Sequence, residues 1–217
     1  MDLFPLWLSL RVSAVATALT LALGIPLAWV LARRDFPGKD LLGALVVLPL
    51  VLPPTVLGYY LLVVVSRHGV IGGALARVGI ELAFTWRAAV LAACLGSIAL
   101  LVKAAQAGFE TVDRRLEQAA RTLGRSEWSI FWAVTLPLAW RSVLAGTILA
   151  FCRAFGDFGI TLMVAGSIPG KTQTLPLAIY DHVQANEMAA ANALAFLAVA
   201  AVIVVLVGVG RLVRLRY

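Results

Sequence analysis

Charged residues are scarce in this sequence. Only 13% of its 217 residues are Asp, Glu, Lys or Arg, whereas an ordinary soluble domain has about a quarter. Hydrophobic residues make up 62%. The shortage of charge therefore argues against a soluble domain and indicates that lipid surrounds most of the chain.

Cysteine and histidine are also scarce, with two of each. Cys94 and Cys152 lie inside apolar stretches without a ligand pattern, which predicts small buried side chains rather than a disulfide or a metal site. His68 and His182 fall in two different connections, with no ligand spacing around either. The residue patterns of hydrolases, metalloenzymes and redox proteins are missing too, so we expect no catalytic residue, metal or cofactor in this chain.

Five apolar stretches can cross a membrane as helices, since ~20 residues at ~1.5 Å each span the hydrocarbon layer. They lie at about residues 10–32, 41–65, 88–109, 142–166 and 188–210. The first opens with Asp2 and lacks a basic cluster and a small-residue cleavage site, which favours a span over a signal peptide. The predicted fold class is an all-α integral membrane protein of five transmembrane helices, with one domain over residues 1–217.

The basic residues are distributed unevenly, although the net charge of +7 by itself would suit a nucleic-acid partner. In the five-span arrangement, 12 of the 18 Lys and Arg residues fall on one side and four on the other. The positive-inside rule then places the N-terminus outside and the C-terminus in the cytoplasm. The charge is a topology signal, and no nucleic-acid partner is expected.

Prolines interrupt the second span. Pro49, Pro53 and Pro54 remove backbone donors, which predicts a kink or an unwound turn. Broken backbone in a membrane is tolerated only where protein or a water-filled cavity covers it. A packing kink and part of a transport path both fit this pattern.

The fourth span contains two opposite charges four residues apart, Arg153 and Asp157. That spacing places them on one helix face, and a charge in a span must find a partner or line water. One hypothesis is a plain intrahelical ion pair. The other is that Arg153 faces a dimer axis and, with Asp157 and the flanking glycines 156 and 159, forms part of a gate.

The connection at about residues 110–141 is too long for a simple turn. Leu116, Ala119, Ala120 and Leu123 recur at helical spacing among charged residues, which predicts a short amphipathic helix that ends at Gly124. Such a helix can lie flat on the lipid headgroups or dock into a groove of a partner protein.

The same connection resembles the "EAA" loop of bacterial ABC importer permeases, which reads Glu-Ala-Ala, three residues, Gly, nine residues, Ile-x-Leu-Pro. Here residues 117–124 read Glu-Gln-Ala-Ala-Arg-Thr-Leu-Gly, and Val-Thr-Leu-Pro follows at 134–137. Gln118 occupies the place of the motif's Glu, with Glu117 one position earlier, and Val134 replaces Ile. The resemblance implies a coupling helix that inserts into a cytoplasmic ATPase subunit. Its coupling residues are Glu117, Gln118, Ala119, Ala120, Gly124, Leu136 and Pro137.

Three other stretches resemble the molybdate permeases of this family: residues 48–59 around the Pro pair, residues 155–159 (Phe-Gly-Asp-Phe-Gly), and residues 168–180. Sulfate permeases share the acidic-Phe-Gly element but not the Leu-Pro-Pro or Ile-Pro-Gly runs. The resemblance implies a type I ABC importer permease fold and molybdate as cargo, with tungstate or sulfate as alternatives. Candidates for the translocation path or gate are Pro53, Pro54, Arg153, Asp157 and Phe158.

The family also implies partners and a location. Two cytoplasmic ATPase subunits would hold ATP and magnesium, an extracytoplasmic oxyanion-binding protein would deliver the cargo, and a second copy of the chain would complete the path through the membrane lipid. The expected location is the bacterial cytoplasmic membrane. Composition alone also allows a passive channel or scaffold, but such proteins have no use for an ATPase-docking helix. An intramembrane enzyme would need a catalytic pair, which only Arg153 and Asp157 approach.

Residues 165–172, Ala-Gly-Ser-Ile-Pro-Gly-Lys-Thr, fit a relaxed phosphate-loop pattern with Ala in place of the first Gly. The run follows a membrane span on the side assigned as external, and no strand is predicted before it. We therefore expect an external loop that turns at Pro169 and Gly170, and no nucleotide site.

Overall fold

The computed structural model of the protein describes residues 2–214, without the side chains of residues 209, 210 and 212–214. Within this part of the chain five helical segments are long and apolar enough to cross a membrane, which confirms the predicted all-α membrane protein. Arg216 and Tyr217, predicted to be cytoplasmic, lie outside the described residues. The elements are α1 (Phe4–Arg33), α2 (Lys39–Val51), α3 (Pro54–Val65), α4 (Val70–Ala76), α5 (Trp86–Glu110), α6 (Arg114–Thr122), α7 (Glu127–Ile130), the π-helix η1 (Phe131–Thr135), α8 (Leu136–Phe155), α9 (Gly159–Ala165), α10 (Leu175–Gln184) and α11 (Met188–Arg214).

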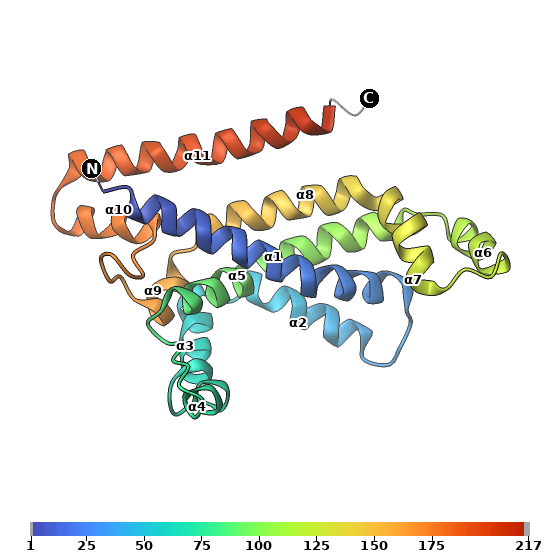
Figure 1. Ribbon diagram of the computed structural model, residues 1–217, viewed down its shortest axis with the longest axis horizontal. Coiled ribbons are helices and arrows are strands. Elements are labelled where there is room, and N and C mark those ends of the chain that lie inside the picture. The colour runs from blue at the N-terminus through green and yellow to red at the C-terminus, as the bar shows by residue number, and fades with distance from the viewer. Residues whose placement is uncertain (1, 215–217) are drawn as a thin grey trace.

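Helix α5 is the centre of the bundle, packed between α1 and α8 (Figure 1). In the most apolar 18-residue stretch of α5, 67% of the residues are buried, whereas in the corresponding stretch of α11 only 11% are buried. Small residues permit this close packing: a Cβ added at Gly146 of α8 would lie 2.8 Å from the Cβ of Ala104, and one at Gly108 would lie 2.4 Å from Ser142. Six buried alanines of α5 form much of the contact: Ala88, Ala89, Ala92, Ala93, Ala99 and Ala105.

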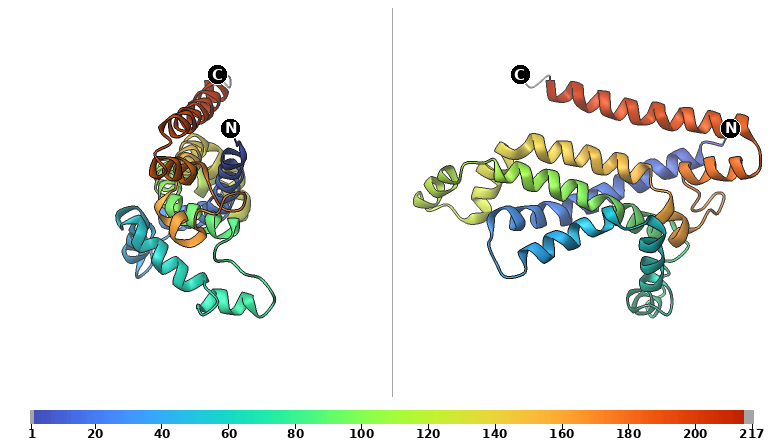
Figure 2. Two further views of the ribbon diagram at one scale, coloured as in Figure 1. Left: turned by 90° about the vertical axis from the view of Figure 1, so that its left-hand side faces the viewer. Right: turned by 180° about the vertical axis from the view of Figure 1, so that it is seen from behind.

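The predicted interruption of the second span is a complete break between two helices. Helix α2 ends at Val51, and α3 begins at Pro54. Leu52 and Pro53 between them have extended backbone, with ψ of 146° and 133°, because a residue that precedes proline avoids the helical region. Helix α3 then leaves the bundle at a steep angle to α2 (Figures 1 and 2). The stretch expected as one span at 41–65 is therefore two helices, and the second candidate span runs over Pro54–Ala76.

The stretch expected as one span at 142–166 is also divided. Helix α8 ends at Phe155, and α9 begins at Gly159. Asp157 stabilises the start of α9, because its Oδ2 accepts hydrogen bonds from the Thr161 backbone N–H (3.0 Å) and hydroxyl (2.7 Å). The spacing of apolar residues did not predict this break, since both helices remain apolar.

The molecule has two distinct ends. The start of α1, together with α9 and α10, lies at one end, and α6 lies at the other (Figure 1). Helix α11 runs along the side of the bundle and packs mainly against α10 near its own start (Figure 2). Phe196, Val199 and Val204 of α11 are exposed. Apolar surface of this kind is expected where lipid or another membrane helix covers a protein.

Candidate functional site

The predicted amphipathic helix is present at one tip of the molecule as α6 (Figure 1). Asp113 caps its first turn by accepting a hydrogen bond from the Arg115 backbone N–H at 2.9 Å. Gly124 follows with φ of +76°, a conformation that residues with a Cβ rarely adopt. The left-handed glycine lets the chain reverse direction into α7, which leads through η1 to α8.

Glu117 is buried inside the protein. It is 3% exposed, and its Oε1 lies 3.1 Å from Nη2 of Arg33, the last residue of α1. The hydroxyl of Thr135 in η1 donates to the same oxygen at 2.6 Å, and Arg33 Nη2 also donates to the Val112 carbonyl at 3.0 Å. This network ties α6 to α1 and to the π-helix.

Gln118, in contrast, is exposed on the outer side of α6, next to the exposed Ala119. Leu123 at the end of the helix is 83% exposed. A small exposed residue beside a large apolar one leaves room for a partner's groove to approach the helix closely. The exposed face of α6 thus contains Gln118 and not Glu117.

Two further residues of the predicted coupling set, Leu136 and Pro137, lie away from this face. Leu136 packs against the core cluster around Phe131, and Pro137 is the second residue of α8, directly after the π-helix η1. Both position the connection to α8. Nearby, Arg121 pairs with Glu127 at 2.5 Å, and the hydrogen bond that the Arg121 guanidinium donates to that carboxylate raises the pKa of Arg121.

Sequence reasoning missed Arg33 and Thr135 as members of the site. Arg33 was counted only as a positive charge in a connection, and Thr135 only as an unassigned residue of the family pattern. The chain offers no local signal that joins them, because they come from helices far apart in the sequence. The Nε atom of Arg33 is buried and has no hydrogen-bond partner among the described residues.

The two helix breaks meet in space. A Cβ added at Gly159, the first residue of α9, would lie 2.7 Å from the Cβ of Pro54, the first residue of α3. One turn further on, a Cβ at Gly58 would lie 2.6 Å from the Cβ of Met163. Pro54 is therefore next to the Asp157 break, with glycine required at the contact. Pro53 lies in the linker before it, and both prolines are exposed.

Arg153 and Asp157 form the expected ion pair, with 3.0 Å between Nη1 and Oδ1. They do not share one uninterrupted helix, because Asp157 lies in the break after α8. Its side chain is 2% exposed, whereas that of Arg153 is 31% exposed. Gly96 of α5 lies against both groups, and Phe158 packs on Tyr180 of α10 with 5.1 Å between ring centroids.

Ala165 ends α9, and residues 166–174 form a loop in which several backbone donors are used internally. The N–H groups of Lys171, Thr172 and Gln173 all donate to the Ile168 carbonyl, and the Thr172 hydroxyl donates to the Gly166 carbonyl at 3.0 Å. A phosphate-binding loop needs such N–H groups to point toward the ligand. The loop therefore lacks the geometry that the pattern suggests.

Sequence comparison identifies relatives over most of the chain. The molybdenum transport system permease protein ModB of Escherichia coli strain K12 is 50% identical over 178 residues, which cover 82% of this chain and 78% of that protein. The protein of the same name from Azotobacter vinelandii is 42% identical over 195 residues, or 89% and 86% of the two chains. The sulfate transport system permease protein CysW of Synechococcus elongatus is 36% identical over 174 residues, or 80% and 61%.

Structure comparison finds solved structures of ABC transporters with a similar fold. The MetNI methionine ABC transporter in an inward-facing conformation has a chain that matches with a TM-score of 0.73 at 17% identity, over 97% of this chain and 93% of that one. A chain of a bacterial ABC transporter involved in alginate import matches with a TM-score of 0.74 at 14% identity, over 95% of this chain and 78% of that one. Residues 24–216 match the family model of binding-protein-dependent transport system inner membrane components. With five candidate membrane helices in residues 2–214, the chain belongs to this family and is a multi-pass inner-membrane protein.

Proposed function

We propose that this chain is the permease subunit of an ATP-driven ABC importer that carries molybdate into the cytoplasm. The observation that carries the proposal is the exposed face of α6, which presents Gln118, Ala119 and Leu123 at the tip of a membrane bundle. The family match supplies the context. Relatives named as molybdenum permeases, at 42–50% identity, support molybdate over sulfate, for which the named relative is 36% identical.

In this proposal α6 is the coupling helix. Each of two copies of the chain inserts its α6 into a cleft on one of two cytoplasmic ATPase subunits. Those subunits bind ATP and magnesium, while this chain itself performs no covalent chemistry. When the ATPase subunits close, α6 moves as a rigid body. The Arg33–Glu117 ion pair transmits that movement to α1, and α7 with η1 transmits it to α8.

The transport path would lie where the two helix breaks meet. Broken backbone at membrane depth is stable only beside protein or a cavity. We therefore propose that the moving parts of the path are the two prolines of the first break, Pro53 and Pro54, and the three residues at the second break, Arg153, Asp157 and Phe158. The partly exposed Arg153 would offer a positive charge to the dianion, and Asp157 would limit how tightly the anion is held. A second copy of the chain would cover exposed apolar faces such as that of α3.

Uptake by the reconstituted complex tests the function directly. The permease, its ATPase and its binding protein are incorporated into vesicles, and uptake of labelled molybdate is measured with ATP and competing oxyanions. We expect ATP-dependent uptake that tungstate inhibits strongly and sulfate weakly. Stronger inhibition by sulfate than by tungstate would identify a sulfate permease, and uptake without ATP would identify a passive channel.

The N-terminus and the loop at residues 169–187 are proposed to be external, and α6 cytoplasmic. In a background in which Cys94 and Cys152 are replaced, a cysteine at the exposed Lys171 should react with an impermeant thiol reagent in intact cells. A cysteine at Glu110, exposed at the end of α5 and outside the proposed docking face of α6, is the matched control and should react only after permeabilisation. The reverse pattern of labelling would overturn the orientation.

Gly124→Val should reduce coupling between ATP hydrolysis and uptake. A β-branched residue at φ of +76° is strained by about 1–2 kcal/mol or more, so the turn that presents α6 should shift while the membrane helices remain inserted. Gly124→Asn is the control, because Asn tolerates left-handed backbone and there is open space around the position. Equal uptake by the Val and Asn variants, at equal membrane abundance, would contradict a docking role for this turn.

A further inference from the structure

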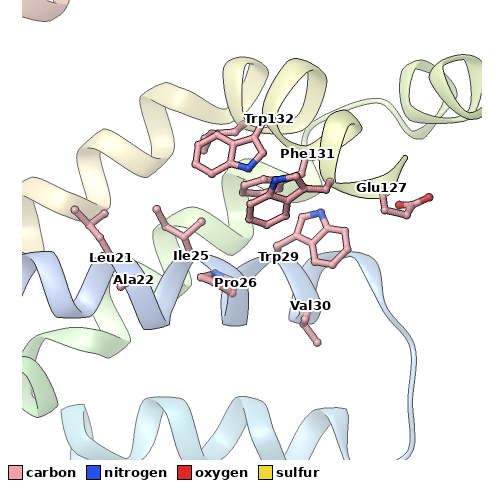
Figure 3. Close-up of a pocket in the computed structure, with 11 residues that line it drawn as sticks. Leu21, Ala22, Ile25, Pro26, Trp29, Val30, Glu127, Phe131 and Trp132 are labelled. Carbon is pink, nitrogen blue, oxygen red and sulfur yellow. The ribbon is translucent and has the colours of Figure 1, made fainter. Parts of the chain in front are cut away.

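An apolar groove of about 560 Å³ lies between the second half of α1 and the segment that joins the coupling helix to α8 (Figure 3). One wall is formed by α1 and the other by α7, η1 and the start of α8. Of the residues that line it, only Glu127 carries a charge. They are Leu21, Ala22, Ile25, Pro26, Trp29, Val30, Glu127, Trp128, Phe131, Trp132 and Leu136.

Aromatic rings form the upper part of the groove (Figure 3). Phe131 is buried and contacts Trp29 edge-on, with 6.1 Å between ring centroids. The ring centroids of Trp128 and Trp132 lie 5.6 Å apart, and both side chains are largely exposed. Tryptophan concentrates where the hydrocarbon layer meets the headgroups, so this end of the groove is placed at the membrane boundary.

The charge at the mouth of the groove is positive. The Arg34 guanidinium lies 5.7 Å from the Trp29 ring centroid, within the range of a cation–π contact. Glu127 pairs with Arg121 and also interacts with the charge of Arg34. These two arginines and one carboxylate leave a net positive charge beside the aromatic rings. Basic groups beside membrane helices attract anionic headgroups.

We infer that this groove binds one acyl chain of an anionic glycerophospholipid, whose phosphate pairs with Arg34. Three observations support this occupant over a protein helix. One wall of the groove is α1, a helix long and apolar enough to span the membrane, where acyl chains are the abundant apolar ligand. The lining of the groove is apolar, and a positive charge lies at its mouth. The bound chain contacts both α1 and the link between α6 and α8. Its binding does not depend on which oxyanion the protein transports.

Photolabelling tests the inference on the full importer complex in nanodiscs. Phosphatidylglycerol with a diazirine on one acyl chain is added at low mole fraction, and labelled peptides are mapped by mass spectrometry. We expect residues 21–30 and 127–136 to be labelled in preference to the exposed face of α11, which contacts bulk lipid. Labelling of the groove no greater than that of α11 would overturn the inference, because another protein segment would then cover the groove.

Two variants and a control sharpen the result. Ala22→Phe fills the groove and should abolish its preferential labelling. Ala14→Phe, the same change at an exposed α1 position that does not line the groove, should leave the labelling unchanged. Arg34→Gln should lower the preference for phosphatidylglycerol over phosphatidylcholine about fivefold, equivalent to ~1 kcal/mol for one basic residue near an anionic surface. If Arg34→Gln leaves the preference for phosphatidylglycerol unchanged, the proposed contact between Arg34 and the phosphate is wrong. If the groove is still labelled in the Ala22→Phe variant, the lipid binds elsewhere.

Discussion

Glu117→Leu should destabilise the importer by about 3–5 kcal/mol, the usual effect of removing one partner of a buried ion pair. The Arg33 side chain is 7% exposed and would lose the only carboxylate that it contacts among the described residues. The Thr135 hydroxyl would lose its acceptor at the same time. The measurement is the thermal unfolding of the detergent-solubilised complex, together with ATPase stimulation by loaded binding protein.

The adjacent Gln118→Leu variant is the matched control, since it makes a similar change one position along α6 at an exposed site. It should alter stability by no more than about 0.5 kcal/mol and act instead on affinity for the ATPase subunit. The double variant Arg33→Met with Glu117→Leu should recover most of the lost stability, because the unpaired charge is gone. Equal unfolding temperatures for Glu117→Leu and Gln118→Leu would show that the ion pair does not anchor α6.

Replacing Arg153 with Met and Asp157 with Asn together should leave the protein folded but reduce molybdate uptake by about tenfold to a hundredfold. That range corresponds to the ~1.5–3 kcal/mol of one charge-assisted contact with the dianion. Asn is chosen because its side-chain oxygen can still accept the Thr161 N–H that Asp157 caps. Single replacement of Asp157 by Ala would remove the cap and strand Arg153, so a loss of folding would hide any effect on transport.

Uptake is compared at equal membrane abundance, with Arg153→Lys as the variant that keeps the positive charge. We expect Arg153→Lys to retain most activity and the neutral double variant to lose it. If the neutral double variant transports as well as the wild type, the pair only makes Arg153 tolerable in the membrane. In that case the plain ion-pair hypothesis holds, and neither residue contributes to the path.

Composition and local pattern were sufficient for the fold class and the family. A charge content of 13% and five apolar stretches allow few solutions other than a helical membrane bundle, because each span must satisfy its own backbone groups. The loop helix was predictable for the same local reason: its apolar spacing is that of an α-helix, and Gly124 ends it. An interruption near Pro53 and Pro54 was predictable from the missing backbone donors of proline, although Pro49, which belongs to the same pattern, lies inside α2 without ending it.

Tertiary structure decided which residues meet. The loop sequence left open whether Glu117 or Gln118 faces a partner, and only the position of Arg33 shows that Glu117 points inward. The break at Asp157 was hidden because apolar spacing continues through it, and its contact with Pro54 depends on two glycines and the packing of α3 on α9. Local sequence encodes backbone preference and burial, whereas the pairing of charges and the meeting of two breaks depend on the packing of distant helices.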